Sequence, residues 1–193
     1  MTRYLVVYYS WTGNTKRVAK AVADCLGADL EEIVEERPYT GPFARFLHAL
    51  DSIVRRKPPI ALSKHDVGDY DVVIFGSPVW AADMAAPMRS FLAREKGRVA
   101  RAAFFCTQSG LGGETALVGM ADATGAEPLS ILLLNGRQLE AFGWRSSVDR
   151  FTQSIENAVS MRQHSGETVR ESRPGSPGRA RTVHDEEIHN APR

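Results

Sequence analysis

Short apolar runs alternate with stretches of helical periodicity along most of this chain, and this alternation limits the folds that it can adopt. The apolar runs predict strands at 3–9, 30–34, 72–75, 102–106 and 129–134. Between and after them, apolar residues recur at helical spacing over 15–26, 43–54, 87–95, 114–124 and 147–161. Strands that alternate with helices form a parallel sheet with helices on both faces. We therefore predict a three-layer, doubly wound α/β fold with five parallel strands.

The composition is that of one domain with an ordinary core. The chain has 193 residues, of which 43% are hydrophobic, and a formal net charge of +1. Its two cysteines, Cys25 and Cys106, lie far apart, which favours free thiols within the core of a protein from a reducing compartment. No apolar run approaches the roughly 20 residues of a membrane span, and the first run breaks at Ser10, unlike a signal peptide. We expect a cytoplasmic domain over 1–163 that neither spans a membrane nor binds nucleic acid.

The most specific segment is Ser10-Trp11-Thr12-Gly13-Asn14-Thr15, which joins the first strand to the first helix. The free N–H groups of a helix's first turn, aided by the helix dipole, form an anion site, and nearby hydroxyls add donors. The segment lacks the G-x-x-x-x-G-K-[ST] and G-x-G-x-x-G patterns of nucleoside triphosphate and pyrophosphate sites. It predicts a site for one phosphate monoester, with an ordinary turn capped by Thr12 or Asn14 as the alternative. Lys16 falls inside the helix, where we expect it to face solvent.

Two further segments follow later apolar runs: Gly76-Ser77-Pro78-Val79-Trp80 and Thr107-Gln108-Ser109-Gly110-Leu111-Gly112-Gly113. Residues 10–15 match the pattern [ST]-x-T-G-x-T, and the three segments together resemble, in residues and in order, the cofactor loops of the flavodoxin family. The resemblance covers residues 3–160. It implies a flavodoxin-like strand order of 2-1-3-4-5 and FMN as the cofactor, bound at the carboxyl ends of the strands.

The resemblance also implies a role for each loop. The first would hold the FMN phosphate, the second would place Trp80 against the flavin ring, and the third would offer backbone groups to the pyrimidine end. For the glycines of the third loop, plain turn chemistry is the alternative. The implied cofactor-binding residues are Ser10, Trp11, Thr12, Gly13, Asn14, Thr15, Pro78, Val79, Trp80, Ala81, Thr107, Gln108, Ser109, Gly110 and Gly113.

Other chemistries do not fit the spacing. Neither cysteine is followed six residues later by the arginine that a cysteine-type phosphatase needs, because Glu31 and Gly112 stand there. The G-x-S-x-G motif of a serine nucleophile is absent, and so are Cys and His pairs at zinc spacing. The acids near the loops are Asp83 and Glu114, which we expect to be a loop charge and a helix cap. We therefore predict no catalytic side chain and no metal site.

Two kinds of function use a flavin in such a site. An electron carrier needs an exposed flavin edge and a redox partner protein. An enzyme, such as an FMN-dependent NAD(P)H:quinone reductase or a protoporphyrinogen oxidase-like dehydrogenase, needs a pocket for a quinone or porphyrinogen. Carrier flavodoxins are acidic as a family, whereas residues 1–163 hold 19 Lys and Arg against 18 Asp and Glu, so that steering field is missing. A domain that has lost its cofactor is the third alternative.

Two segments lie outside the three loops. We expect the helix at 43–54 either to cover the sheet or to lie over the site. The basic run Arg55-Arg56-Lys57 that follows it either complements the helix dipole or forms a docking patch for a partner. Residues 164–193 are rich in Ser, Gly, Arg, Glu and Pro, which predicts a disordered tail. Within it His184 and His189 flank an acidic run, which we interpret as solvated, with metal binding as the alternative.

Overall fold

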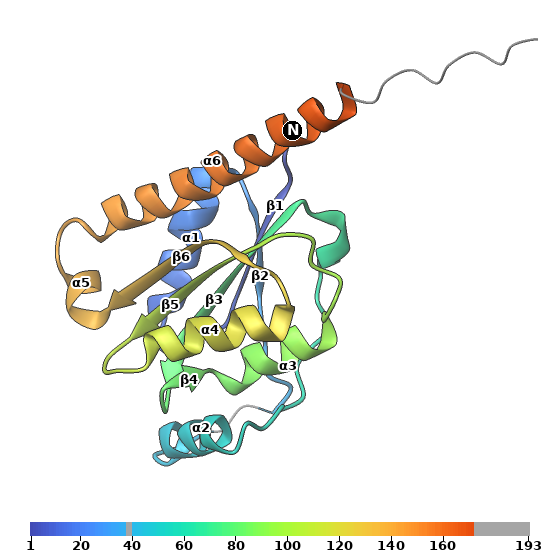
Figure 1. The fold of residues 1–193 in the computed structure, drawn as a ribbon. Helices are drawn as coiled ribbons and strands as arrows, with labels where there is room; N and C mark the ends of the chain where they lie inside the picture. The colour runs from blue at the N-terminus through green and yellow to red at the C-terminus, as the bar shows by residue number, and fades with distance from the viewer. Residues whose placement is uncertain (38–39, 172–193) are drawn as a thin grey trace, which may run out of the picture.

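A computed structural model describes residues 1–37 and 40–171 (Figure 1). Its sheet has parallel strands in the order β2-β1-β3-β5-β6, which is the predicted order 2-1-3-4-5 when the parallel strands alone are numbered. The short strand β4 pairs antiparallel with the end of β3. The strands are β1 (Tyr4–Tyr8), β2 (Asp29–Glu32), β3 (Val72–Trp80), β4 (Asp83–Met84), β5 (Ala102–Gln108) and β6 (Pro128–Asn135).

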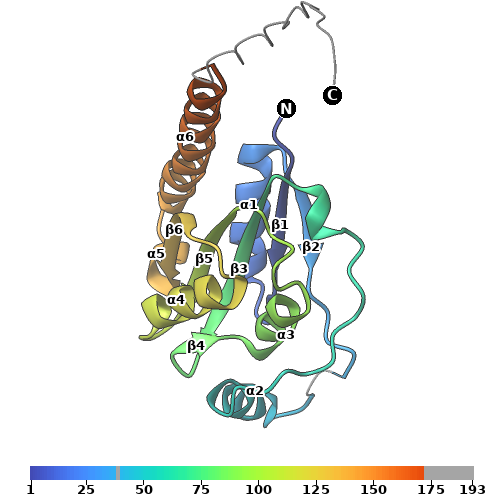
Figure 2. The same cartoon turned by 45° about the vertical axis from the view of Figure 1, so that its right-hand side comes forward.

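Helices cover both faces of the sheet (Figure 2). Helices α1 (Asn14–Leu26) and α6 (Trp144–Glu171) contribute apolar side chains to the core on one face. Helices α3 (Ala86–Arg94) and α4 (Gly113–Thr124) do the same on the other face. The predicted three-layer α/β architecture is confirmed.

Strand β1 shows how the sequence builds both cores at once. Side chains alternate between the two faces of a strand. Leu5 and Val7 point into the core beneath α3 and α4, whereas Val6 and Tyr8 point into the core beneath α1 and α6. All four are buried, which is why the run reads as continuously apolar.

Strands β3 and β5 run further than their apolar patterns predict. Residues 76–80, expected to be a loop, form the second half of β3, where Pro78 lies opposite Thr107 of β5. The last residues of β3 find a partner because the chain folds back as β4 after Ala81 and Ala82. This turn lacks the Gly or Asn that marks most two-residue hairpins, so the sequence pattern does not reveal it.

The helices differ from expectation at two places. Cys25 is exposed at the edge of α1, where its Sγ lies 3.7 Å from Asp149 Oδ1 of α6, so the expectation that it fills the core is wrong. Helix α6 continues to Glu171 rather than ending at 161, since no proline interrupts the chain between Pro128 and Pro174. Residues 172–193 lie outside the described residues, so the disordered tail and the boundary at 163 stay predictions.

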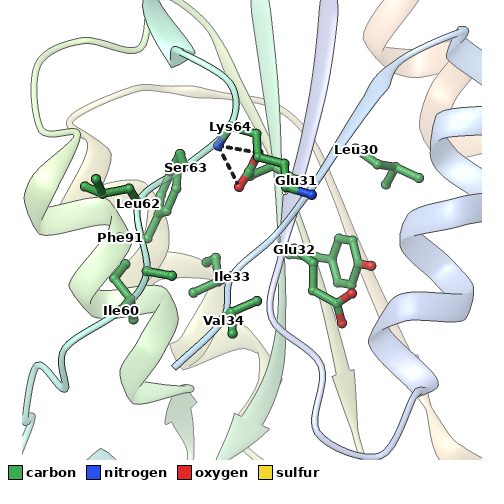
Figure 3. Close-up of a pocket in the computed structure, with 12 residues that line it drawn as sticks. Leu30, Glu31, Glu32, Ile33, Val34, Ile60, Leu62, Ser63, Lys64 and Phe91 are labelled. Carbon is green, nitrogen blue, oxygen red and sulfur yellow. Dashed lines mark hydrogen bonds between the residues drawn. The ribbon is translucent and has the colours of Figure 1, made fainter. Parts of the chain in front are cut away.

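Strand β2 is an edge strand, and the chain covers its free side with the segment that returns from α2 (Ala44–Ile53). The Ala61 N–H donates to the Val34 carbonyl at 2.9 Å. The Glu31 carboxylate accepts from the Lys64 N–H at 3.1 and 3.2 Å (Figure 3). A hollow of about 440 Å³ remains between the two segments. Covering an edge in this way protects it from pairing with another chain.

The sequence favoured a position of helix α2 over the sheet. The structure places it elsewhere. It contacts α3, β3 and β4 and lies at the end of the molecule in both ribbon views (Figures 1 and 2). Among residues 1–37 and 40–171, no helix is both long enough and apolar enough to span a membrane.

Gly76 gives a test of the close packing at the centre of the sheet. A Cβ at this position would lie 2.0 Å from Cζ of the buried Phe105 ring. We expect Gly76→Ala to lower the free energy of unfolding by about 1–3 kcal/mol, because the ring has no space to move into. The control is Gly136→Ala, whose Cβ would meet nothing within 4 Å. Urea unfolding followed by circular dichroism measures both, and equal stability of the two variants would contradict the packing argument.

Candidate functional site

The first predicted loop leads directly into helix α1. The N-cap is Gly13, with φ of 89°, rather than Thr12 or Asn14. Glycine reaches this left-handed conformation without strain, and it has no side chain to occupy the N–H groups of the first turn. The Ser10 hydroxyl accepts from the Lys16 N–H at 3.2 Å, and the Lys16 ammonium pairs with Glu32 at 2.6 Å. Ser10 therefore already occupies one N–H group of the first turn, and the Lys16 side chain is turned toward β2.

The three predicted segments meet around one pocket of about 500 Å³ at the carboxyl ends of β1, β3 and β5. Parallel strands bring the loops that follow them to the same edge of the sheet, which explains the convergence. Of the residues implied from the sequence, those that line the pocket are Trp11, Thr12, Asn14, Pro78, Val79, Trp80, Ala81, Thr107, Gln108, Ser109 and Gly110.

Four of the implied residues do not line the pocket: Ser10, Gly13, Thr15 and Gly113. Three lining residues were not predicted: Ala82, Leu111 and Leu139. Leu139 comes from α5 (Gly136–Glu140), a helix that the apolar pattern did not predict. The sequence does carry a signal for it, because Asn135 and Gln138 form a capping box, each side chain bonding the other's backbone N–H.

Thr15 acts inside the fold rather than in the pocket. Its hydroxyl lies 2.8 Å from the Thr107 hydroxyl, and both side chains are buried. This hydrogen bond joins the start of α1 to the end of β5. It therefore fixes the spacing between the first and third loops.

The glycines of the third loop allow close packing rather than free movement. Gly112 has φ of 96°, and a Cβ there would lie 2.3 Å from Ala82 Cα. The Gly113 N–H donates to Gln108 Oε1 at 2.8 Å, and a Cβ on Gly113 would lie 2.3 Å from Leu133 Cδ1. The loop before α4 thus rests directly on the β3–β4 hairpin.

The indoles of Trp11 and Trp80 line the pocket, and the buried Tyr9 ring packs behind Trp80. Trp80 packs edge to face against Tyr9 and Trp11, with ring centroids 5.6 and 6.0 Å apart. The Tyr9 hydroxyl donates to Glu35 Oε1 at 2.5 Å. Burial, reinforced by the Glu35 carboxylate, holds the pKa of Tyr9 well above its usual value. Tyr9 therefore stays protonated and keeps its ring fixed against Trp80.

The turn between β3 and β4 is strained. Ala81 and Ala82 both have positive φ, 48° and 61°, which fits the type I′ geometry of a two-residue hairpin. A Cβ disfavours this region. The turn persists because Arg89 Nη2 donates to Asp83 Oδ2 at 2.8 Å and Ser77 Oγ accepts from the Ala85 N–H at 3.0 Å. Asp83 is thus a structural charge, as expected, and the surroundings hold the turn.

Among residues 1–37 and 40–171, the pocket lining contains no ionisable side chain. Burial raises the pKa of the Cys106 thiol, and the charge of Asp83 adds to this, so Cys106 stays a neutral thiol in the core, as predicted. Within the part of the chain that the structure describes, no three His, Cys, Asp or Glu side chains cluster as a metal site. The pocket can bind a ligand and tune it, but its walls supply no proton donor or acceptor with a pKa near neutrality.

The Thr15–Thr107 pair can be tested by a double-mutant cycle. We expect Thr107→Val to lower the free energy of unfolding by about 1–3 kcal/mol, because the buried Thr15 hydroxyl loses its partner. Combining Thr15→Val with Thr107→Val should recover part of that loss, since both polar groups are then removed. Urea unfolding of the four proteins measures the coupling, and strictly additive losses would argue against the bond.

Strain in the hairpin turn predicts an easy gain in stability. Replacing both residues, Ala81→Asn with Ala82→Gly, supplies the pair that a type I′ turn prefers. We expect the midpoint of urea unfolding to rise, with a gain of about 1 kcal/mol. The control is Ala93→Gly at an exposed position of α3, which should instead lower the stability. A loss of stability in the turn variant would show that the alanines carry no strain.

A family model described as flavodoxin matches residues 3–120. A flavoprotein of Lactobacillus acidophilus, solved in complex with FMN, is 25% identical, with a TM-score of 0.60 over 79% of this chain and 99% of that one. A flavoprotein of Bacteroides eggerthii is 21% identical, with a TM-score of 0.63 over 81% and 99%. Oxidised flavodoxin 2 of Bacillus cereus is 17% identical, with a TM-score of 0.53 over 80% and 98%. The family match covers more than half of the chain, which therefore belongs to the flavodoxin family.

Proposed function

We propose that this protein binds FMN in the pocket at the carboxyl edge of the sheet and transfers electrons through it. The observation that carries the proposal is the composition of that one pocket. Its lining combines Thr12 and Asn14, at the N-terminus of α1, with the indoles of Trp11 and Trp80. A phosphate monoester and a flat aromatic ring are the two ends of FMN.

The pocket also fits the size and charge of this ligand. Its volume of about 500 Å³ lies in the usual range of small-molecule sites. In the part of the chain that the structure describes, no carboxylate lines it to repel a phosphate dianion. The flavoprotein of Lactobacillus acidophilus that binds FMN has the same fold, which adds independent support. One anion site and no dinucleotide motif favour FMN over FAD.

Each wall would have its own task. The first-turn N–H groups of α1 and the Thr12 hydroxyl would hold the phosphate. The Trp80 indole would lie against the flavin ring, and the backbone of 107–110 would meet its polar edge. FMN supplies the redox chemistry, because its ring system accepts and releases electrons. The protein's part is to bind the ring, exclude water from one side of it and leave the other side open.

Electron transfer to a partner protein is the function that this lining favours. A carrier needs no acid or base of its own, and the pocket lining has none. A second candidate is an FMN-dependent NAD(P)H:quinone reductase or a protoporphyrinogen oxidase-like dehydrogenase. The near-balanced charge of residues 1–163 favours it, because an acidic field to steer a basic partner protein is missing. Assays of NADH and NADPH oxidation with and without quinones separate the two functions.

The cofactor assignment is tested by isolating the native protein. We expect it to be yellow and to release FMN, identified by mass spectrometry. Release of FAD, or failure of the apoprotein to take up FMN on reconstitution, would refute the assignment.

Two substitutions test which wall holds which part of FMN. Thr12→Ala should weaken FMN binding by about 1–3 kcal/mol and leave riboflavin binding unchanged, because riboflavin has no phosphate. Trp80→Ala should weaken both ligands alike, since it removes a ring contact. Trp144→Ala is the matched control, because Trp144 packs against Arg17 and Arg145 outside the pocket. Fluorescence titration gives the dissociation constants. An equal loss of affinity for both ligands in Thr12→Ala would show that Thr12 does not hold the phosphate.

A further inference from the structure

The apolar stripe of helix α2 faces away from the protein. Phe43, Phe46, Leu50 and Ile53 recur at intervals of three or four residues, so they share one face of the helix. Their exposures are 72%, 64%, 43% and 64%. An amphipathic helix of a soluble domain ordinarily turns this face to the core. A contiguous exposed apolar surface of this kind marks a site of interaction.

Polar contacts fix the helix in this orientation. Asp51 and Ser52, on the opposite side, are buried, with exposures of 6% and 1%. The Ser52 hydroxyl lies 3.5 Å from the carbonyl oxygen of Met84, in β4. Just beyond the helix, the Arg56 carbonyl accepts from Arg89 Nη1 at 3.3 Å. Rotating the apolar stripe inward would break these contacts and expose the buried Asp51 side, so the outward face is built into the fold.

The same segment concentrates positive charge. Residues 37–65 contain six Lys and Arg and one acid, Asp51, a formal charge of +5 in a chain whose formal net charge is +1. Asp51 is buried and pairs with Arg56 at 3.4 Å, so the segment presents no exposed carboxylate. Arg55 and Lys57 lie exposed at the end of the stripe. The segment is basic and apolar at once.

The apolar stripe and the positive charge together indicate which kind of partner covers α2. A second copy would bring two segments of like charge together, which opposes association. The energetic hot spots of protein interfaces are enriched in Trp, Tyr and Arg and poor in Leu, whereas this stripe contains Leu50 and neither Trp nor Tyr. A hydrocarbon stripe flanked by basic residues is the composition of a helix that lies in the interface of an anionic membrane.

We propose that α2 docks this protein on the surface of an anionic lipid bilayer. Phe43, Phe46, Leu50 and Ile53 enter the boundary between headgroups and acyl chains, and Arg55, Arg56 and Lys57 meet the lipid phosphates. Helix α2 packs against the β3–β4 hairpin, whose turn lines the pocket, so docking brings that turn close to the membrane. The proposal does not depend on FMN, because the surface is complete in the protein alone.

Flotation of the full-length protein with lipid vesicles tests the proposal. At low ionic strength we expect the protein to float with vesicles of equal parts phosphatidylcholine and phosphatidylglycerol, but not with pure phosphatidylcholine, and sodium chloride should release it. Phe46→Ser with Ile53→Ser, and separately Arg55→Gln with Lys57→Gln, should each weaken binding by on the order of tenfold or more. Thermal melts establish that these surface variants stay folded.

The control is Phe142→Ser, which removes an even more exposed apolar side chain outside α2 and should leave flotation unchanged. Absence of flotation by the parent protein overturns the proposal. An equal loss of vesicle binding in Phe142→Ser also overturns it, because the adhesion would then be unspecific. Sedimentation velocity provides the remaining check: a dimer that Phe46→Ser with Ile53→Ser abolishes would make a second copy the occupant of α2 and overturn the membrane proposal.

Discussion

Strand β3 pairs with β1 on one side and β5 on the other, and its last two residues pair with β4 instead. The other parts of the pocket depend on this strand. Its registers with β1 and β5 bring the loops after those strands level with one another. The turn of the hairpin that it forms with β4 lines the pocket as well, and Gly112 lets the loop before α4 rest on this turn. Within this frame the Thr15–Thr107 hydrogen bond ties the first loop to the third.

Much of this could be read from the sequence, because it depends on periodicity and loop position. Apolar runs and helical spacing predict the layers and the strand order, and the loops after three parallel strands then have to meet. The hairpin turn was not predictable, since Ala81 and Ala82 carry no turn signal and adopt their conformation under the constraint of Asp83, Arg89 and Ser77. Nor could spacing tell that Thr15 would bond another buried hydroxyl instead of facing the pocket.

Helix α2 shows a different limit of sequence patterns. Periodicity identifies an apolar face, but it does not tell what that face meets. The arrangement at the end of this helix reverses the usual one, because the buried residues there are Asp51 and Ser52, and a hydrogen bond and an ion pair compensate their burial. A polar anchor and an apolar exterior together produce the basic, hydrocarbon-rich surface at one end of a nearly neutral molecule.

Arg89 bears on how this architecture can change over evolutionary time. Its buried guanidinium donates to the Arg56 carbonyl after α2 and to Asp83 and the Met84 carbonyl of β4, and its Nε has no hydrogen-bond partner among the described residues. Deleting helix α2 would therefore take an acceptor from a cation that is already incompletely satisfied. The helix is not a detachable module: a lineage that lost it would also have to replace Arg89, and with it the support of the hairpin.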